Sequence, residues 1–228
     1  EDPTRLTALA TNYRRKPLCC LTDIVAFNNY PGWYGSNADA MAGELSRYNK
    51  VGASRGIGVS EYGAGGSILH QDLSLKRVDP GGEWHPEQWQ AYLHERQYSA
   101  IMNAPYCWGS FVWAMFDFSS DGRSEGDRPG VNDKGLMTHD RKIRKDVFYF
   151  YSAQWSREPV LHLTSKRYRI RNTSDVSVKV YTNLKKVTLS VNGKALGDAE
   201  PDALCAASWK HVQLQKGSNQ IKVSSKGN

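Results

Sequence analysis

The residue whose position most clearly suggests chemistry is Glu61, because it directly follows a short apolar run, Gly56 to Ser60. Small residues come next, in the order Tyr62-Gly63-Ala64-Gly65-Gly66-Ser67, so a substrate can approach closely. At the carboxyl end of a barrel strand, a carboxylate of this kind suits a nucleophile or a base. The alternative is a strand-end glutamate that caps the following loop.

An aromatic loop, Asn28 to Tyr34, follows another apolar run. The phenol of Tyr30 in this loop can hydrogen-bond a neighbouring carboxylate and hold it ionised. We interpret Asn28 and Trp33, together with Trp113 near the end of a later apolar run, as candidates for binding a ring-shaped substrate. The alternative is that these aromatic side chains pack in the core.

Other possible reactive residues carry weaker signals. Alternation along a strand would place Trp108 and Trp113 on opposite faces unless a bulge intervenes, so Trp108 is assigned to the core. Asp117 is interpreted as a loop cap, and His70 as a solvated loop residue. The histidines and the four cysteines show no metal-ligand spacing, and nucleotide-binding and serine-nucleophile motifs are absent. We therefore expect no metal and no cofactor.

Strands and helices must position these candidates. Four apolar runs, 6–11, 18–27, 56–60 and 106–116, alternate with helical patterns at 37–50, 86–102 and 146–154. Strands that alternate with helices predict a parallel sheet, in which the carboxyl ends of the strands meet at one edge. Four such units make half of an eight-stranded barrel or a small open sheet.

The composition changes near residue 157. Short alternating stretches follow, at 160–163, 168–171, 177–181, 187–191, 211–214 and 220–224. Asn192-Gly193 is a strong signal for a two-residue hairpin turn. The pattern predicts an immunoglobulin-like sandwich over 157–228, after an α/β domain over 1–156.

Charge and hydropathy exclude some classes of protein. The 228 residues have a net charge of +7, but the basic residues are scattered, so we expect no nucleic-acid partner. No apolar run approaches the roughly 20 residues of a membrane helix, so we expect no membrane partner. The polar start contains no signal peptide, and a periplasmic, secreted or cytoplasmic location stays open.

Several segments resemble glycoside hydrolase family 2, and within it the bacterial β-galactosidases. They are Asp2 to Arg5, Asp23 to Tyr34, Gly58 to Ser67, Trp108 to Arg123 and Gly130 to Gln154. The resemblance covers nearly the whole chain. It implies strands five to eight of a TIM (β/α)8 barrel, followed by an immunoglobulin-like β-sandwich.

The resemblance implies a retaining β-galactosidase-like hydrolase of terminal β-glycosidic bonds. Glu61 matches the nucleophile, Tyr30 the tyrosine that contacts it, and Trp113 an aromatic residue of the sugar pocket. The acid/base glutamate of the family lies in an Asn-Glu motif, and this sequence contains no Asn-Glu pair. We therefore expect a fragment that is inactive by itself. Alternatives are β-glucuronidase or β-mannosidase specificity, or a non-catalytic carbohydrate-binding or structural module.

The expected partners are a carbohydrate substrate and a protein surface. A half barrel leaves two strand edges unpaired and an apolar inner face uncovered. About half of Val25, Phe27, Val59, Phe111 and their neighbours should point inward. We expect self-association, or association with the missing N-terminal part of the same enzyme.

Overall fold

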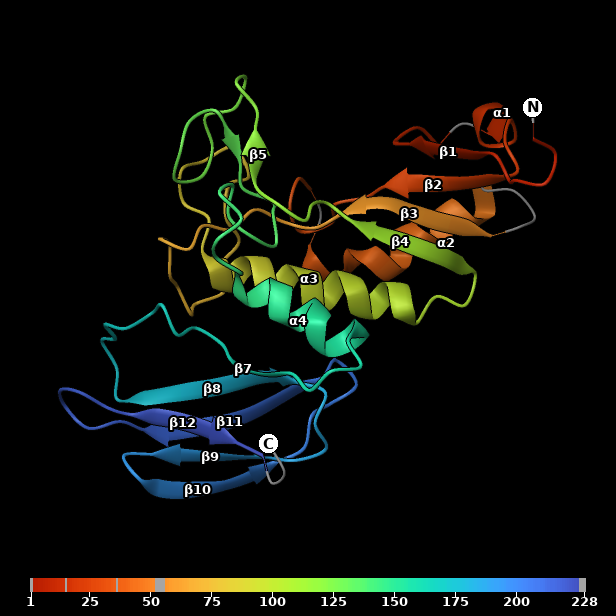
Figure 1. Cartoon of the computed structure of the whole chain (residues 1–228). Helices are drawn as coiled ribbons and strands as arrows, with labels where there is room; N and C mark the ends of the chain where they lie inside the picture. The colour runs from red at the N-terminus through yellow and green to blue at the C-terminus, as the bar shows by residue number, and fades with distance from the viewer. Residues whose placement is uncertain (1, 15, 36, 52–55, 226–228) are drawn as a thin grey trace. The chain divides into compact units, whose positions relative to one another are not determined.

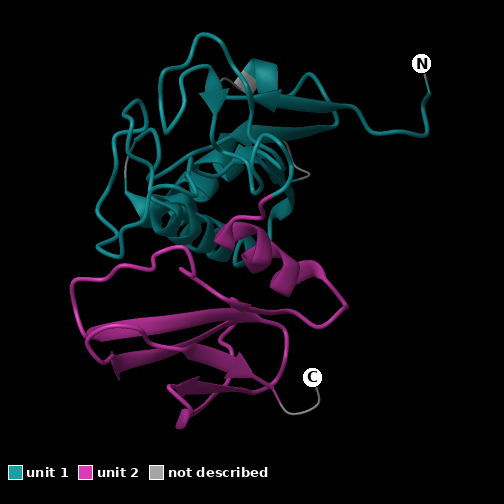
Figure 2. Cartoon of the chain, turned by 60° about the vertical axis from the view of Figure 1, so that its left-hand side comes forward, with its two compact units in different colours: residues 1–142 teal, residues 143–228 magenta. Residues whose placement is uncertain are grey.

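The computed structural model describes residues 2–14, 16–35, 37–51 and 56–225. The chain divides into two compact units, Glu1–Lys142 and Ile143–Asn228 (Figure 2). Helix α4 (Asp146–Trp155) belongs to the second unit, whereas the predicted domain boundary follows this helix. In the described ranges, no helix has the length and apolar character needed to cross a membrane.

The first unit is built on a four-stranded parallel sheet in the order β1-β2-β3-β4 (Figure 1). The strands are β1 (Ala8–Thr11), β2 (Ile24–Asn28), β3 (Ile57–Tyr62) and β4 (Cys107–Val112). The predicted parallel sheet is therefore present. The second run is only partly a strand, because its beginning lies in the short helix α1 (Lys16–Cys19).

Helices pack against one face of this sheet. They are the 3-10 turn η1 (Ala38–Ala40), α2 (Met41–Val51) and α3 (Glu87–Met102) (Figure 1). The Phe27 ring stacks on Tyr48 of α2, with 4.2 Å between the ring centroids. Val25, Phe27 and Val59 are fully buried, so they belong to the helix side of the sheet. Of the residues from which about half were expected on the inner face, these three do not lie there, whereas Phe111 is exposed.

The other face of the sheet carries exposed aromatic side chains. By the alternation along β3, Gly58 faces away from the helices. A Cβ at Gly58 would lie 2.4 Å from the Trp108 ring, so this ring lies on the same face. The pairing of β3 with β4 shifts register after Cys107, so β4 contains a bulge. A bulge reverses the alternation that follows it. Trp108, Phe111 and Trp113 therefore share this face, and all three are exposed, which corrects the assignment of Trp108 to the core.

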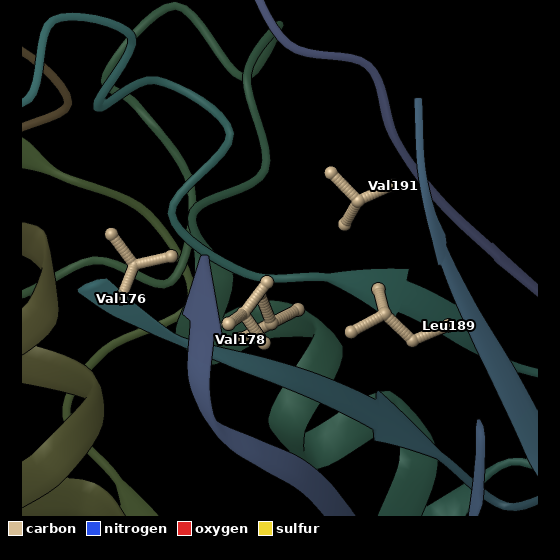
Figure 3. Packing of buried hydrophobic residues seen from close by; sticks show 5 residues of the cluster. Val176, Val178, Leu189 and Val191 are labelled. Carbon is tan, nitrogen blue, oxygen red and sulfur yellow. The ribbon is translucent and has the colours of Figure 1, made fainter. Parts of the chain in front are cut away.

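The second unit contains two three-stranded antiparallel sheets, in the orders β10-β9-β12 and β11-β8-β7. Its strands are β7 (Leu161–Leu163), β8 (Asp175–Thr182), β9 (Val187–Val191), β10 (Lys194–Ala199), β11 (Ala206–Gln213) and β12 (Ile221–Ser224). Val176, Val178, Leu189, Val191 and Val212 form the core between the sheets (Figure 3).

The predicted hairpin turn of this unit is confirmed. Asn192 and Gly193 join β9 to β10 with φ values of 52° and 80°, as a type I′ turn requires. The strand predicted over 168–171 is wrong, because these residues form no strand in the structure.

Candidate active site

Glu61 lies near the end of β3, and Tyr30 follows the end of the neighbouring strand β2. The Tyr30 hydroxyl donates a hydrogen bond of 2.7 Å to the Oε2 atom of Glu61. The backbone supports the pair, because the Asn29 amide donates to the Glu61 carbonyl at 2.8 Å. The predicted contact between these two side chains is therefore present, and it holds the carboxylate at the carboxyl edge of the sheet.

Tyr30 keeps its proton in this position. Burial raises the pKa of Tyr30 well above its usual range, and the hydrogen bond to Glu61 and the charge of Glu61 raise it further. A phenol with a raised pKa remains a hydrogen-bond donor at physiological pH. Tyr30 can therefore orient one oxygen of Glu61 while the other oxygen stays available for chemistry.

The three predicted substrate-binding residues have different surroundings. Trp113 is 37% exposed and meets the Phe118 ring edge to face, with 5.7 Å between the centroids. Asn28 accepts a hydrogen bond of 2.6 Å from the Ser60 hydroxyl beside Glu61. Trp33 is fully buried and packs with Leu93 and other core residues, so it offers a sugar no exposed surface.

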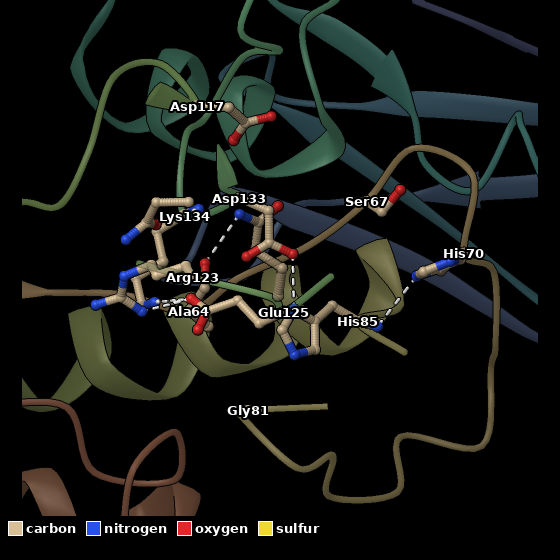
Figure 4. Close-up of polar contacts among 12 residues, drawn as sticks. Ala64, Ser67, His70, Gly81, His85, Asp117, Arg123, Glu125, Asp133 and Lys134 are labelled. Atoms are coloured by element: carbon tan, nitrogen blue, oxygen red, sulfur yellow. Dashed lines mark hydrogen bonds and ion pairs between the residues drawn. The ribbon is translucent and has the colours of Figure 1, made fainter. Parts of the chain in front are cut away.

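Two cations beside Tyr34, Arg123 and Lys134, were not predicted from the sequence. Arg123 forms an ion pair of 2.5 Å with Glu125, and the Lys134 ammonium lies 3.5 Å from the same carboxylate (Figure 4). The Lys134 side chain is only 1% exposed, and its Nζ atom lies 5.2 Å from the centre of the Tyr34 ring. Charged residues in a long loop are normally solvated, which is why they gave no signal.

These cations are linked to Glu61 through two tyrosines. Tyr30 meets Tyr34 edge to face at 5.4 Å. Burial alone would lower the pKa of Arg123, but hydrogen bonds to Tyr34 and Glu125 raise it. The two cations share the Glu125 carboxylate, and Tyr34 and Tyr30 connect them to the Glu61 carboxylate. Both cations are able to donate hydrogen bonds to an anionic group.

Buried polar contacts brace the loop that carries Lys134. The Nδ1 atom of His85 lies 2.7 Å from a carboxylate oxygen of Asp133, and both side chains are buried (Figure 4). Asp117 accepts a hydrogen bond of 2.8 Å from the Gly135 amide, so the prediction that it caps a loop is confirmed. A Cβ at Gly135 would lie 2.0 Å from the Asp117 nitrogen, so only glycine allows this approach.

His85→Phe is expected to lower the free energy of unfolding of the chain by about 3 kcal/mol, because a buried carboxylate would lose its partner. Urea unfolding followed by tryptophan fluorescence measures the change. His139→Phe is the matched control, since His139 is exposed and should change stability by less than about 0.5 kcal/mol. Equal stability of the two variants would show that the His85–Asp133 contact does not brace the loop.

In the described ranges, no group of three or more His, Cys, Asp or Glu side chains could hold a metal ion. His70 is partly buried rather than solvated, because it stacks on Trp84 at 4.5 Å and accepts a hydrogen bond from the His85 amide. The site is therefore composed of a carboxylate, tyrosines and cations.

Comparisons with known proteins find one family model and several similar proteins. Residues 174–228 match a family model described as a domain of unknown function, DUF4982. The chain is 46% identical to a β-glucuronidase of Bacteroides fragilis, over the whole chain and 33% of that protein. The chain therefore spans about a third of the length of this relative.

Two crystal structures are similar over almost the whole chain. One is a "putative beta-galactosidase" from Bacteroides fragilis, with a TM-score of 0.90 and 33% identity over 99% of this chain and 34% of that one. The other is an FMN-binding β-glucuronidase from Facaelibacterium prausnitzii L2-6, with a TM-score of 0.88 and 35% identity over 100% of this chain and 34% of that one. Both similarities extend over the two compact units.

Proposed function

We propose that this chain is a part of a retaining β-glycosidase of glycoside hydrolase family 2, and that it carries the nucleophile, Glu61. One observation carries the proposal: Tyr30 holds Glu61 by a hydrogen bond of 2.7 Å at the carboxyl edge of a parallel sheet. Active sites of α/β barrels lie at this edge.

In this mechanism the free oxygen of Glu61 attacks the anomeric carbon and forms a glycosyl ester. The bond to the leaving oxygen breaks, and an acid supplied by the rest of the enzyme protonates that oxygen. The same group then removes a proton from water, which attacks the anomeric carbon and releases Glu61 as a carboxylate. Tyr30 donates to Glu61 in the resting state and orients it for attack.

The proposal includes a correspondence between the parts of this chain and the domains of a complete enzyme. The four parallel strands correspond to strands five to eight of a TIM barrel, with 1–156 as the barrel part, and 157–228 corresponds to an immunoglobulin-like domain. Trp108, Phe111 and Trp113 are exposed on the face of the sheet opposite α2, and β1 and β4 each leave one edge unpaired in the described sheet. The N-terminal part of the same protein would cover this face, and a second copy would cover it when that part is missing.

The substrate that this site favours is a β-glucuronide. Arg123 and Lys134 place two cations beside Tyr34, which contacts Tyr30. A uronic acid carries its carboxylate on the ring that is attacked, so the same ring can meet Glu61 and the cations. The names of two relatives, both β-glucuronidases, support this choice over a β-galactoside.

The chain assembled with the N-terminal part of its protein is expected to hydrolyse nitrophenyl β-glucuronide at least about 100-fold faster, in kcat/KM, than nitrophenyl β-galactoside. A site built for a charged group rejects an analogue that lacks it by large factors. Lys134→Met should remove most of this preference and leave the galactoside rate similar. A clear preference for the galactoside in the unmodified enzyme would contradict the assignment of the substrate.

A further inference from the structure

Positive charge is concentrated in the second unit. Lys and Arg exceed Asp and Glu by 9 in residues 143–228, whereas acidic residues exceed basic ones by 2 in residues 1–142, which together give +7. No Asp or Glu occurs from residue 159 to residue 174. This stretch contains the basic segment, Lys166-Arg167-Tyr168-Arg169-Ile170-Arg171. Charge of one sign gathered in this way attracts polyanions.

The basic segment lies at the surface between β7 and β8. Its residues form no strand in the structure, and Ile170 is 85% exposed. Lys166 and Arg169 are also exposed. The ion pairs described for this unit use other residues, namely His162 with Asp146, Lys186 with Asp198 and His211 with Asp175. Two of the segment's cations are therefore open to a partner.

Arg171 is half-buried and incompletely paired. Its Nε atom donates to the Tyr168 carbonyl at 3.2 Å, and its guanidinium lies 5.5 Å from the centre of the Tyr168 ring. Its Nη1 atom is buried and has no hydrogen-bond partner among the described residues. Burial lowers the pKa of Arg171. Because this nitrogen is buried, Arg171 supports the position of Tyr168 and does not itself meet a partner from solvent.

Asp146 is a carboxylate close to the segment. Asp146 is buried, and its two oxygens contact the Nε2 atom of His162 at 2.8 Å and the Ser165 amide, which donates at 2.6 Å. Burial lowers the pKa of His162, and the nearby Lys166 and Arg167 charges lower it further, although Asp146 opposes both effects. Lys166 and Arg169 are exposed, and the ion pairs described for this unit involve neither of them.

We propose that the basic segment binds an acidic polysaccharide and so holds a polymeric substrate on the enzyme. Carboxylates of the polymer would contact the exposed side chains of Lys166 and Arg169, and sugar rings would pack on Tyr168. The choice of a uronate polymer rests on the proposed β-glucuronide specificity. The binding itself needs no catalysis.

The experiment uses the full 228-residue chain and titrates it with hyaluronan, a polymer of alternating glucuronate and N-acetylglucosamine. Dextran serves as the neutral polymer and a DNA duplex as a different polyanion. Isothermal titration calorimetry at low and at physiological salt gives the affinities. The test variant is K166E/R169E, and the control is K194E/K222E, which makes the same charge change at exposed positions of β10 and β12.

We expect binding to hyaluronan that weakens with salt, no binding to dextran, and a roughly tenfold loss of affinity in K166E/R169E only. Circular dichroism of both variants separates a loss of binding from a loss of fold. Equal losses in the two variants would overturn the proposal, since net charge alone would then explain the binding. Stronger binding to DNA, or no binding to hyaluronan, would also overturn it. Failure to hydrolyse glucuronides would refute the proposed function without changing these affinities.

Discussion

Glu61→Gln is expected to lower kcat/KM of the assembled enzyme by roughly 10⁴-fold or more, which is the scale of losing a covalent nucleophile. The amide keeps the size of the side chain but cannot form the glycosyl ester. The measurement is hydrolysis of an activated nitrophenyl glycoside by the chain together with the N-terminal part of its protein. Residual activity within about tenfold of the unmodified enzyme would show that another group attacks the sugar.

Two further variants distinguish a nucleophile from a residue that only supports the site. Tyr30→Phe removes one hydrogen bond to a charged group, worth about 1.5–3 kcal/mol, so activity should fall roughly 10- to 150-fold. Glu61→Ala opens one side of the anomeric carbon, so added azide should attack there and give the α-glycosyl azide. If Glu61 had only a structural role, no glycosyl azide would form. If Tyr30→Phe were as inactive as Glu61→Gln, the two residues could not be assigned different roles, which would contradict Glu61 as the nucleophile.

The isolated chain is expected to have negligible hydrolase activity, because its sequence contains no Asn-Glu pair to supply the acid/base carboxylate of the proposed mechanism. Loss of general acid/base help lowers rates by roughly 10²–10⁴-fold. The test compares the chain alone with the chain mixed with the N-terminal part, using a glucuronide whose leaving group needs protonation. Mixing should restore most of the rate.

Sedimentation of the same samples provides the control for assembly. Alone, the chain should form dimers or larger species through its uncovered sheet face, and with the N-terminal part it should form a mixed complex. Turnover by the chain alone that Glu61→Gln abolishes would show that a second carboxylate is present in this sequence. A monomer of 25.6 kDa in both samples would contradict the expected interface.

Local signals in the sequence predicted the features that depend on a few neighbouring residues. Glu61 lies near the end of one parallel strand, and the loop that contains Tyr30 follows the neighbouring strand. The side chains of Glu61 and Tyr30 were therefore expected to meet at one edge of the sheet. Asn192-Gly193 predicted its turn because both residues tolerate positive φ. These predictions needed no knowledge of contacts distant in sequence.

Features that depend on tertiary contacts were missed. The bulge in β4 reversed the alternation between Trp108 and Trp113, and nothing in their spacing announces a bulge. Strand β10 has almost no buried residue, because it is an edge strand, so it lacks an alternating apolar pattern. Residues 168–171 have such a pattern but no strand partner.

The cations of the site show the same limit. Lys134 is buried only because Trp33, Tyr34 and Glu125 approach it from other parts of the chain. The sequence around Lys134 is polar and rich in glycine, and by itself it predicts a solvated loop. The burial of Lys134 beside Tyr34 therefore could not be predicted from local pattern alone.

The central claim is that Glu61 becomes covalently bonded to the sugar, and mass spectrometry of a trapped intermediate tests it most directly. The reagent is a 2-deoxy-2-fluoro-β-glucuronyl fluoride, whose fluorine at C2 slows both steps and whose fluoride leaving group needs little protonation. After reaction with the assembled enzyme, peptide mapping should locate one fluorosugar on Glu61, and Glu61→Gln should abolish the adduct. An adduct on any other residue, or turnover with no adduct at all, would contradict the account.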